Sequence, residues 1–481
     1  MNTPANTPRS ITADLCIIGA GSAGLSAAAG AAMLGLDVVL YERGEMGGDC
    51  LNTGCVPSKA LISAAKHAAT IREASAFGVH TEPPRTDWND VKAHIRKAID
   101  TIAPVDSQER FEGLGVTVIR EHAHFIDRHT IGSATTRTKA RRIVIAAGSH
   151  AFIPPIDGLA DTPFLTNETL FDMPEFPEHL LILGGGPIGI EMAQAFRRLG
   201  AQVTVIEMAE ALSRSEPAHA EIVLQTLKKE GVTVLEGAKA TQVSGEAGNI
   251  NVTIESTGGQ STITGSHLLV AVGRQTALEG LNLEAGNVAY TKKGITVDDT
   301  LRSNSNKRVW ALGDIAGMEQ FTHVAGWHAS VFVRRALFKQ RTKAHSLPLP
   351  AVTYTAPELA QIGLTEAQAR EKHGDQIKIS HFSFEENDRA ISEGKPVGEA
   401  RLVIRKGRII GASIVGEGAG ETLQIIALAM SNKLKVKDLT NFVSPYPTRS
   451  EVVKRAASSH FTDALFSPRT KKLVGLLQRI R

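Results

Sequence analysis

Cys50 and Cys55 are the residues of this sequence whose type and spacing most directly suggest chemistry. Four residues separate them, so a helical or near-helical turn can bring the two sulfur atoms together, and a slightly distorted turn permits disulfide geometry. The pair Gly47–Gly48 precedes them and Lys59 follows. A helix N-terminus and a nearby lysine both favour a thiolate, so both cysteines have reasons to be reactive. The alternative is two buried, inert thiols, and the flanking motifs argue against it.

A glycine-rich turn lies upstream of the cysteines. The short apolar run at 14–18 predicts a buried strand. It leads into Gly19, Gly21 and Gly24, then into an Ala-rich helical stretch and a second strand that ends at Glu42. This order is typical of a dinucleotide fold: the glycines allow a tight turn, close approach of a pyrophosphate and close helix–strand packing. The helix N-terminus favours phosphate, and Glu42 can hold ribose hydroxyls.

The same pattern occurs a second time. A strand at 180–183 precedes Gly184, Gly186 and Gly189, and the next strand ends at Glu207. Two such units predict two bound nucleotides. An acid at the ribose position repels a 2′-phosphate, so NAD is favoured over NADP. Arg214 follows closely in the sequence and keeps NADP open.

Three further segments help to divide the chain into domains. A buried strand at 143–148 ends in Gly148, and the second nucleotide unit closes near Gly273. Another strand ends in Gly313 and Asp314, where an aspartate is more often a turn former than a ligand. After Pro348 and Pro350 the pattern changes to alternating strands and amphipathic helices, which predicts a different, α+β domain.

Length and composition exclude several classes of protein. A chain of 481 residues predicts two to four domains, and 42% hydrophobic with 21% charged residues is ordinary for a globular protein. The net charge of +3 is small and gives no argument for nucleic acid. Three cysteines favour a reducing, cytoplasmic setting over a disulfide-stapled secreted one. We expect no signal peptide in 1–12 and no transmembrane segment.

The last segment predicts a basic amphipathic helix. Ser467 is a suitable N-cap and Pro468 a suitable first residue. Apolar residues share one face and basic residues lie largely elsewhere; the apolar ones are Leu473, Leu476, Leu477 and Ile480. Such a helix can lie on a membrane, but we expect this one to pack on its own protein.

Together these residues resemble the class I pyridine nucleotide-disulfide oxidoreductases, which include dihydrolipoamide dehydrogenase, glutathione reductase and mercuric reductase. The likeness covers nearly the whole chain, and the segment from the glycine pair through Cys50 and Cys55 to Lys59 is its most specific part. The resemblance implies an α/β fold with two Rossmann-like dinucleotide-binding domains and a C-terminal α+β dimerisation domain. The implied bounds are 1–151 for the first part of the FAD domain, 152–274 for the NAD(P) domain, 275–347 for a central segment completing the FAD domain, and 348–481 for the dimerisation domain.

The resemblance also implies roles for individual residues. Lys59 and Glu191 resemble an ion pair beside the flavin ring, and Tyr446 and Glu451 occupy the C-terminal catalytic motif. The expected FAD contacts are Gly19, Gly21, Gly24, Glu42, Lys59, Gly148, Gly313 and Asp314. The expected NAD contacts are Gly184, Gly186, Gly189, Glu207 and Gly273. Members of the family are homodimers in which each active site borrows residues from the partner's C-terminal domain.

The implied reaction is an electron relay from NADH through FAD to a Cys50–Cys55 disulfide. By resemblance, Cys55 is the sulfur next to the flavin and Cys50 is the interchange thiol that meets a small-molecule or lipoyl-type disulfide. Disulfide-reducing members have a histidine where this chain has Tyr446. A tyrosine has a pKa of roughly 10 and is a poor base at neutral pH.

Two alternatives remain. Mercuric reductases share the Pro-Tyr-x-Thr-x-x-Glu pattern, so a metal or quinone could be the acceptor, although no cysteine follows Cys55 to deliver a metal. The second alternative is a flavin-binding redox sensor or complex subunit without rapid turnover. The intact cysteine pair and both nucleotide folds favour an enzyme.

Overall fold

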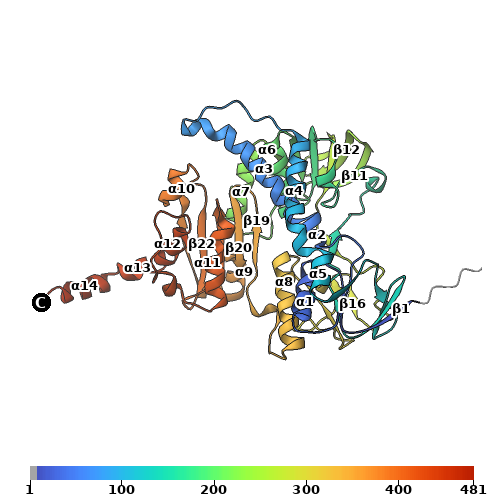
Figure 1. The fold of residues 1–481 in the computed structure, drawn as a ribbon. Coiled ribbons are helices and arrows are strands. Elements are labelled where there is room, and N and C mark those ends of the chain that lie inside the picture. Colours follow the sequence, from blue (N-terminus) through green and yellow to red (C-terminus); the bar gives the residue numbers. More distant parts are fainter. Residues whose placement is uncertain (1–7, 481) are drawn as a thin grey trace, which may run out of the picture. The chain divides into compact units, whose positions relative to one another are not determined.

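The computed structural model describes residues 8–480 of the chain. It divides the chain into two compact units, which are described separately (Figure 1). Unit 1 comprises Met1–Glu178, Ser244–Ile250 and Ser266–Ser346, and unit 2 comprises His179–Val243, Asn251–Gly265 and Leu347–Arg481. The predicted α/β class is confirmed by this mixture of helices and sheets. The four-part domain division stays a prediction.

Unit 1 is built on a seven-stranded sheet of order β3-β2-β1-β6-β5-β4, with β18 also paired to β6. Strands β1, β2, β3, β6 and β18 run parallel, as a dinucleotide fold requires. The strands of unit 1 are β1 Arg9–Ile18, β2 Val38–Tyr41, β3 Val116–Ile119, β4 His124–Phe125, β5 Thr130–Gly132, β6 Thr136–Ile145, β7 Ser149–Ala151, β14 His267–Val270, β15 Arg274–Thr276, β16 Tyr290–Thr291, β17 Gly294–Ile295 and β18 Val309–Ala311.

Small and branched side chains let the helices of unit 1 approach this sheet closely. The Ala-rich helix α1 packs against α8, and their alanines join the buried core formed by β1, β2, β6 and β18. Helices α3 and α4 pack against each other. The helices of unit 1 are α1 Ser22–Ala32, α2 Gly48–Asn52, α3 Cys55–Glu73, α4 Trp88–Asp106, α5 Gln108–Gly113 and α8 Thr322–Phe332.

Unit 2 begins with the second nucleotide fold, in which β8, β9 and β10 are parallel neighbours. Its elements are β8 His179–Leu183, α6 Pro187–Leu199, β9 Gln202–Ile206, α7 Pro217–Lys229 and β10 Thr233–Leu235. A three-stranded sheet follows, made of β11 Lys239–Glu246, β12 Asn249–Ser256 and β13 Gly259–Gly265. Its residues 244–250 are counted with unit 1.

The C-terminal part of unit 2 is a five-stranded antiparallel sheet of order β19-β20-β23-β22-β21. Helices α11 and α12 pack on it and share its apolar core. The strands are β19 Pro350–Thr353, β20 Glu358–Gly363, β21 Ile377–Ser383, β22 Glu399–Arg405 and β23 Arg408–Gly416. The helices are α9 Glu366–His373, α10 Asp388–Ser392, α11 Ala419–Ser431, α12 Glu451–Ser459, α13 Thr462–Leu465 and α14 Pro468–Leu477.

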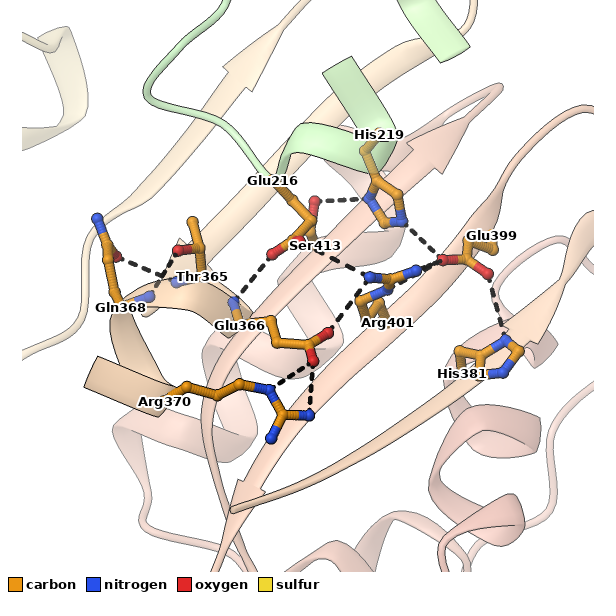
Figure 2. Close-up of polar contacts among 10 residues, drawn as sticks. All are labelled: Glu216, His219, Thr365, Glu366, Gln368, Arg370, His381, Glu399, Arg401 and Ser413. Atoms are coloured by element: carbon orange, nitrogen blue, oxygen red, sulfur yellow. Dashed lines mark hydrogen bonds and ion pairs between the residues drawn. The ribbon is translucent and has the colours of Figure 1, made fainter. Parts of the chain in front are cut away.

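A buried histidine links α7 to this antiparallel sheet (Figure 2). His219 is fully buried; its Nδ1 lies 2.7 Å from Ser413 Oγ and its Nε2 lies 3.0 Å from Glu399 Oε1. Glu399 also pairs with Arg401 at 2.8 Å and with His381 at 3.2 Å. Buried polar groups that are fully paired in this way hold neighbouring elements in one arrangement.

The C-terminal helix corrects one expectation. Ser467 caps α14 and Pro468 begins it, as predicted, but no residue of α14 is buried within residues 8–480. The expected packing of its apolar face on its own subunit is therefore wrong for the part of the chain that the structure describes. Across the described residues, no helix is long and apolar enough to cross a membrane.

Candidate active site

The two cysteines lie on consecutive helices, the short α2 and the longer α3, at the nucleotide-binding turn of unit 1. Gly48 has a φ of +63°, and a Cβ there would lie 2.8 Å from the Cα of Gly21. Glycine is therefore needed for the redox segment to approach the first glycine turn so closely. After Gly48, Cys50 lies in α2 and Cys55 is the first residue of α3.

Both cysteines are thiols in the structure, and their surroundings separate their acidities. The pKa of Cys55 is lowered to about 6, first by a hydrogen bond from Cys50 and further by the hydroxyl of Thr322 and the charge of Lys59. The pKa of Cys50 is raised, because its hydrogen bond to Cys55 and its burial favour the protonated form. Near neutral pH the pair therefore holds one negative charge, on Cys55.

The first glycine turn fits the pyrophosphate and ribose of FAD. A Cβ on Gly24 would lie 1.8 Å from the carbonyl oxygen of Gly19, so α1 can pack this closely on the end of β1 only with glycine at position 24. Within the described chain no side chain caps the first turn of α1, which leaves its N–H groups to an anion. Glu42 accepts hydrogen bonds from the backbone N–H groups of Ala20 at 2.6 Å and Gly44 at 2.7 Å.

The sequence reasoning missed most of the polar group around Asp314. Ser149 donates to Asp314 at 2.5 Å, and Arg274 donates to Ser149 Oγ at 2.7 Å. Arg274 also pairs with Asp49 at 3.2 Å, which ties this group to the redox segment. Burial raises the pKa of Asp314. These partners come from distant parts of the chain, and no local motif marks them.

Gly148 and Gly273 flank the short antiparallel pair formed by β7 and β15. Phe152 N–H donates to the carbonyl of Gly273 at 3.0 Å, and Ala277 N–H donates to that of Gly148 at 3.1 Å. The structure thus brings two of the predicted glycines to the two ends of one ladder.

Gly313 stands beside a histidine that sequence reasoning also missed. Its backbone N–H donates to His328 Nδ1 at 3.1 Å. Burial lowers the pKa of His328 to about 4, so the ring stays neutral and can accept this bond. Gly313 itself has a φ of +73°, a conformation that favours glycine.

The second glycine turn repeats the geometry of the first. Glu207 accepts from the N–H of Gly185 at 2.7 Å and from that of Ala209 at 2.8 Å. A Cβ on Gly189 would lie 2.0 Å from the carbonyl oxygen of Gly184. As at α1, no side chain within residues 8–480 caps α6 at Gly186. These residues fit a second dinucleotide.

The predicted pair Lys59 and Glu191 belongs to two different units, so its geometry stays a prediction. Lys59 lies one turn after Cys55 in α3 and lowers the pKa of that thiol. Glu191 is buried in α6 and accepts a hydrogen bond from the backbone N–H of Tyr354 at 2.9 Å.

In the C-terminal motif, Tyr446 and Glu451 each contact a residue outside the motif. Tyr446 is exposed and donates to Asp388 at 2.6 Å, which raises its pKa. Glu451 begins α12 and pairs with Arg455 at 2.9 Å, one turn further on. Tyr446 is thus held as a hydrogen-bond donor, and its raised pKa leaves even less of the deprotonated form that could accept a proton near neutral pH.

Comparison with known proteins defines the class. Residues 13–329 match the family described as pyridine nucleotide-disulphide oxidoreductase, and residues 349–457 match the dimerisation domain of the same family. The chain belongs to this family, as its sequence motifs predict.

Individual relatives agree with this assignment. The chain is 34% identical to a mercuric reductase of Streptomyces lividans, over 94% of this chain and 96% of the relative. It is 31% identical to a dihydrolipoyl dehydrogenase of Geobacillus stearothermophilus, over 93% of this chain and 96% of the relative. The structure of the HOCl-induced flavoprotein disulfide reductase RclA from Escherichia coli superposes with a TM-score of 0.83 and 26% identity, over 92% of this chain and 99% of that one.

Family membership confirms the predicted enzyme class, cofactors and redox keywords. The protein is a flavoprotein oxidoreductase that uses FAD and NAD(P)H, and its C-terminal part is a dimerisation domain. Family membership does not fix the substrate, because a mercuric reductase and a dihydrolipoyl dehydrogenase have similar sequence identity to this chain, 34% and 31%.

Proposed function

We propose that the protein passes electrons from NADH through FAD to the Cys50–Cys55 pair and then to a small-molecule or lipoyl-type disulfide. The observation that supports this most strongly is the position of Cys55: its Sγ lies at the N-terminus of α3 and 3.1 Å from the Thr322 hydroxyl, which lowers the pKa of this thiol. Thiol–disulfide exchange needs one thiolate and one exchanging thiol, and this pair supplies both. FAD, when bound, supplies two-electron transfer between the nicotinamide and the cysteine pair.

Each cysteine then has its own role. Cys50 donates its proton along the existing hydrogen bond to Cys55, and the Cys50 thiolate attacks the substrate disulfide. The substrate S–S bond breaks, a mixed disulfide with Cys50 forms, and the leaving sulfur takes the proton from Cys55 and departs as a thiol. The Cys55 thiolate then attacks the Cys50 sulfur and closes the Cys50–Cys55 disulfide, and the second substrate sulfur leaves as a thiolate that takes a proton from water. Lys59 and Thr322 stabilise the charge that Cys55 carries between these steps.

The remaining assignments rest on the same site. Glu207 favours NADH, because a carboxylate at the ribose repels a 2′-phosphate. The dimerisation domain supports a homodimer, with Tyr446 and Glu451 serving the partner's site. The low cysteine count, three in 481 residues, favours the cytoplasm over an oxidising compartment.

A soft metal ion is the main competing acceptor, since the Streptomyces lividans relative is called a mercuric reductase. One observation argues against it: no cysteine follows Cys55 in the sequence to deliver a metal.

An acceptor panel tests the proposal. Purified protein with NADH is offered lipoamide, glutathione disulfide, mercuric ion with excess thiol, and a quinone. We expect turnover with a disulfide, and loss of that turnover in Cys50→Ser. Turnover with the metal or quinone alone would overturn the disulfide assignment. A flavin that reduces and then stays reduced with every acceptor would favour a redox sensor.

A further inference from the structure

The segment after α12 carries apolar side chains that the fold leaves exposed. Within the described residues 8–480, α14 buries none of its side chains. The apolar side chains of this segment are 48% to 70% exposed; they are Leu465, Phe466, Leu473, Val474, Leu476, Leu477 and Ile480. Soluble domains seldom expose so many large apolar residues together, unless the surface binds something.

The exposed leucines of α14 lie on one face of the helix. Leu473, Leu476 and Leu477 follow the spacing i, i+3, i+4 within α14, and Ile480 comes three residues after the helix ends. Lys471 and Lys472 fall off that stripe, whereas Arg469, four residues before Leu473, lies at its N-terminal end. The helix is therefore amphipathic, with an apolar face and a basic face.

The hydrogen bonds at the start of α14 are local to residues 464–470. The Ser467 side chain accepts from the N–H of Thr470 at 3.3 Å, and the Thr470 hydroxyl donates to the carbonyl of Ala464 at 2.8 Å. The matched dimerisation domain ends at residue 457, before α13 and α14. In Figure 1 these two helices follow α12 at the C-terminal end of the chain. The segment thus lies outside the matched domain.

Charge decides between possible binding partners. From Ala464 onward the sequence contains no Asp or Glu; its charged residues are Arg469, Lys471, Lys472, Arg479 and Arg481. A run with only positive charge, next to an apolar stripe of aliphatic side chains, matches the chemistry of an anionic lipid surface. A ten-residue helix is about 15 Å long, about half the hydrocarbon thickness of a bilayer, so it lies along the surface.

We propose that residues 464–480 form a membrane-surface anchor that docks the enzyme on anionic lipid. The apolar stripe enters the boundary between headgroups and acyl chains, and the basic side chains contact the phosphates. The anchor is separate from the nucleotide turns and the cysteine pair, so this proposal does not depend on which acceptor the enzyme uses.

Vesicle sedimentation of the full-length, FAD-loaded enzyme tests the anchor. One vesicle set contains phosphatidylcholine alone, and the other contains equal parts of phosphatidylcholine and phosphatidylglycerol. We expect sedimentation with the phosphatidylglycerol vesicles, reduced by added salt. Lys471→Gln with Lys472→Gln removes two charges and should weaken partitioning about 30-fold.

Two further variants make the test specific. Leu473→Glu with Leu477→Glu should abolish sedimentation while the enzyme keeps its wild-type rate with a water-soluble acceptor, because both side chains are exposed. The matched control, Arg96→Gln with Lys97→Gln, removes two adjacent exposed charges from α4 and should sediment like the wild type. Equal sedimentation with both vesicle sets, or none with either, would overturn the proposal. Loss of the dimer in the leucine variant would overturn it as well, because the helix would then belong to an interface between two copies.

Discussion

The Sγ atom of Cys55 lies 3.1 Å from the hydroxyl oxygen of Thr322, although the two residues are 267 positions apart in the chain. Cys55 is the first residue of α3 and Thr322 is the first residue of α8. The sulfur therefore lies at the N-terminus of its own helix and beside the first residue of a second one. Both positions favour a thiolate, because helix N-termini stabilise negative charge.

Removing the Thr322 hydroxyl should raise the pKa of Cys55. A hydrogen bond to a charged group contributes roughly 1.5 to 3 kcal/mol, so Thr322→Val should move this pKa upward from about 6 by about one to two units. Thiolate absorbance, followed against pH in the reduced protein, measures the shift. Thr322→Ser keeps the hydroxyl and should titrate like the wild type. An unchanged pKa of Cys55 in the valine variant would show that Cys50 and Lys59 lower this pKa without the Thr322 hydroxyl.

Replacing Tyr446 by histidine should speed exchange with dihydrolipoamide. The hydrogen bond to Asp388 raises the pKa of Tyr446, so it cannot serve as a base near neutral pH. A positioned general base contributes about 100-fold or more, and Tyr446→His should gain at least about tenfold in kcat. Tyr446→Phe removes the hydroxyl without adding a base and should show no gain. A folded, FAD-loaded histidine variant at the wild-type rate would mean that another step limits the reaction.

Shortening Glu207 should weaken the use of NADH. Both of its carboxylate oxygens are already held by backbone N–H groups, at 2.7 and 2.8 Å, so the side chain is fixed where a ribose would bind. Glu207→Ala should lower kcat/KM for NADH about tenfold or more and narrow the preference over NADPH. Glu210→Ala, an exposed acid three residues on, serves as the control. Equal loss with both coenzymes would indicate a general folding defect.

The Glu399 contacts to His219 and Arg401 should make the stability of the enzyme depend on pH in acid. The hydrogen bond from His219 is the main reason that the pKa of Glu399 falls from 4.5 to about 2. Its stabilisation is therefore complete above about pH 4.5 and is lost as pH falls toward about 2. Glu399→Gln should lower the free energy of unfolding by roughly 1 to 3 kcal/mol at neutral pH.

That difference from the wild type should shrink between pH 4.5 and about 2. Urea unfolding at a series of pH values measures it. The exposed Glu385 supplies a control, and Glu385→Gln should follow the wild type throughout. A constant difference for Glu399→Gln across this range would contradict the role given to its charge.

Structural features that depend on residues close together in the sequence could be predicted from it. Contacts between residues far apart in the sequence could not. Gly19, Gly24 and Gly189 were recognisable because strand, turn and helix follow one another locally, and the structure shows the close approaches that require glycine. Ser149 and Arg274 were not, because they meet Asp314 only after β7 and β15 pair.

One further residue and one helix show the same limit. Asp388, the partner of Tyr446, lies 58 positions away from it and carries no motif of its own. The helix at 468–477 was correctly predicted from its cap. The prediction that its apolar face packs on its own protein was wrong, because an apolar stripe does not indicate which surface it contacts.

The central claim is that Cys50 and Cys55 form the redox centre, and alkylation with mass spectrometry tests it most directly. The oxidised, FAD-loaded enzyme is treated with iodoacetamide without oxygen, before and after NADH is added. We predict that neither cysteine is modified before NADH and that both become modifiable after it, while Cys16, buried in β1, stays unmodified throughout. In Cys50→Ser, FAD should remain bound and reducible, with disulfide turnover abolished. Flavin reduction by NADH that leaves the modification of Cys50 and Cys55 unchanged would contradict the claim.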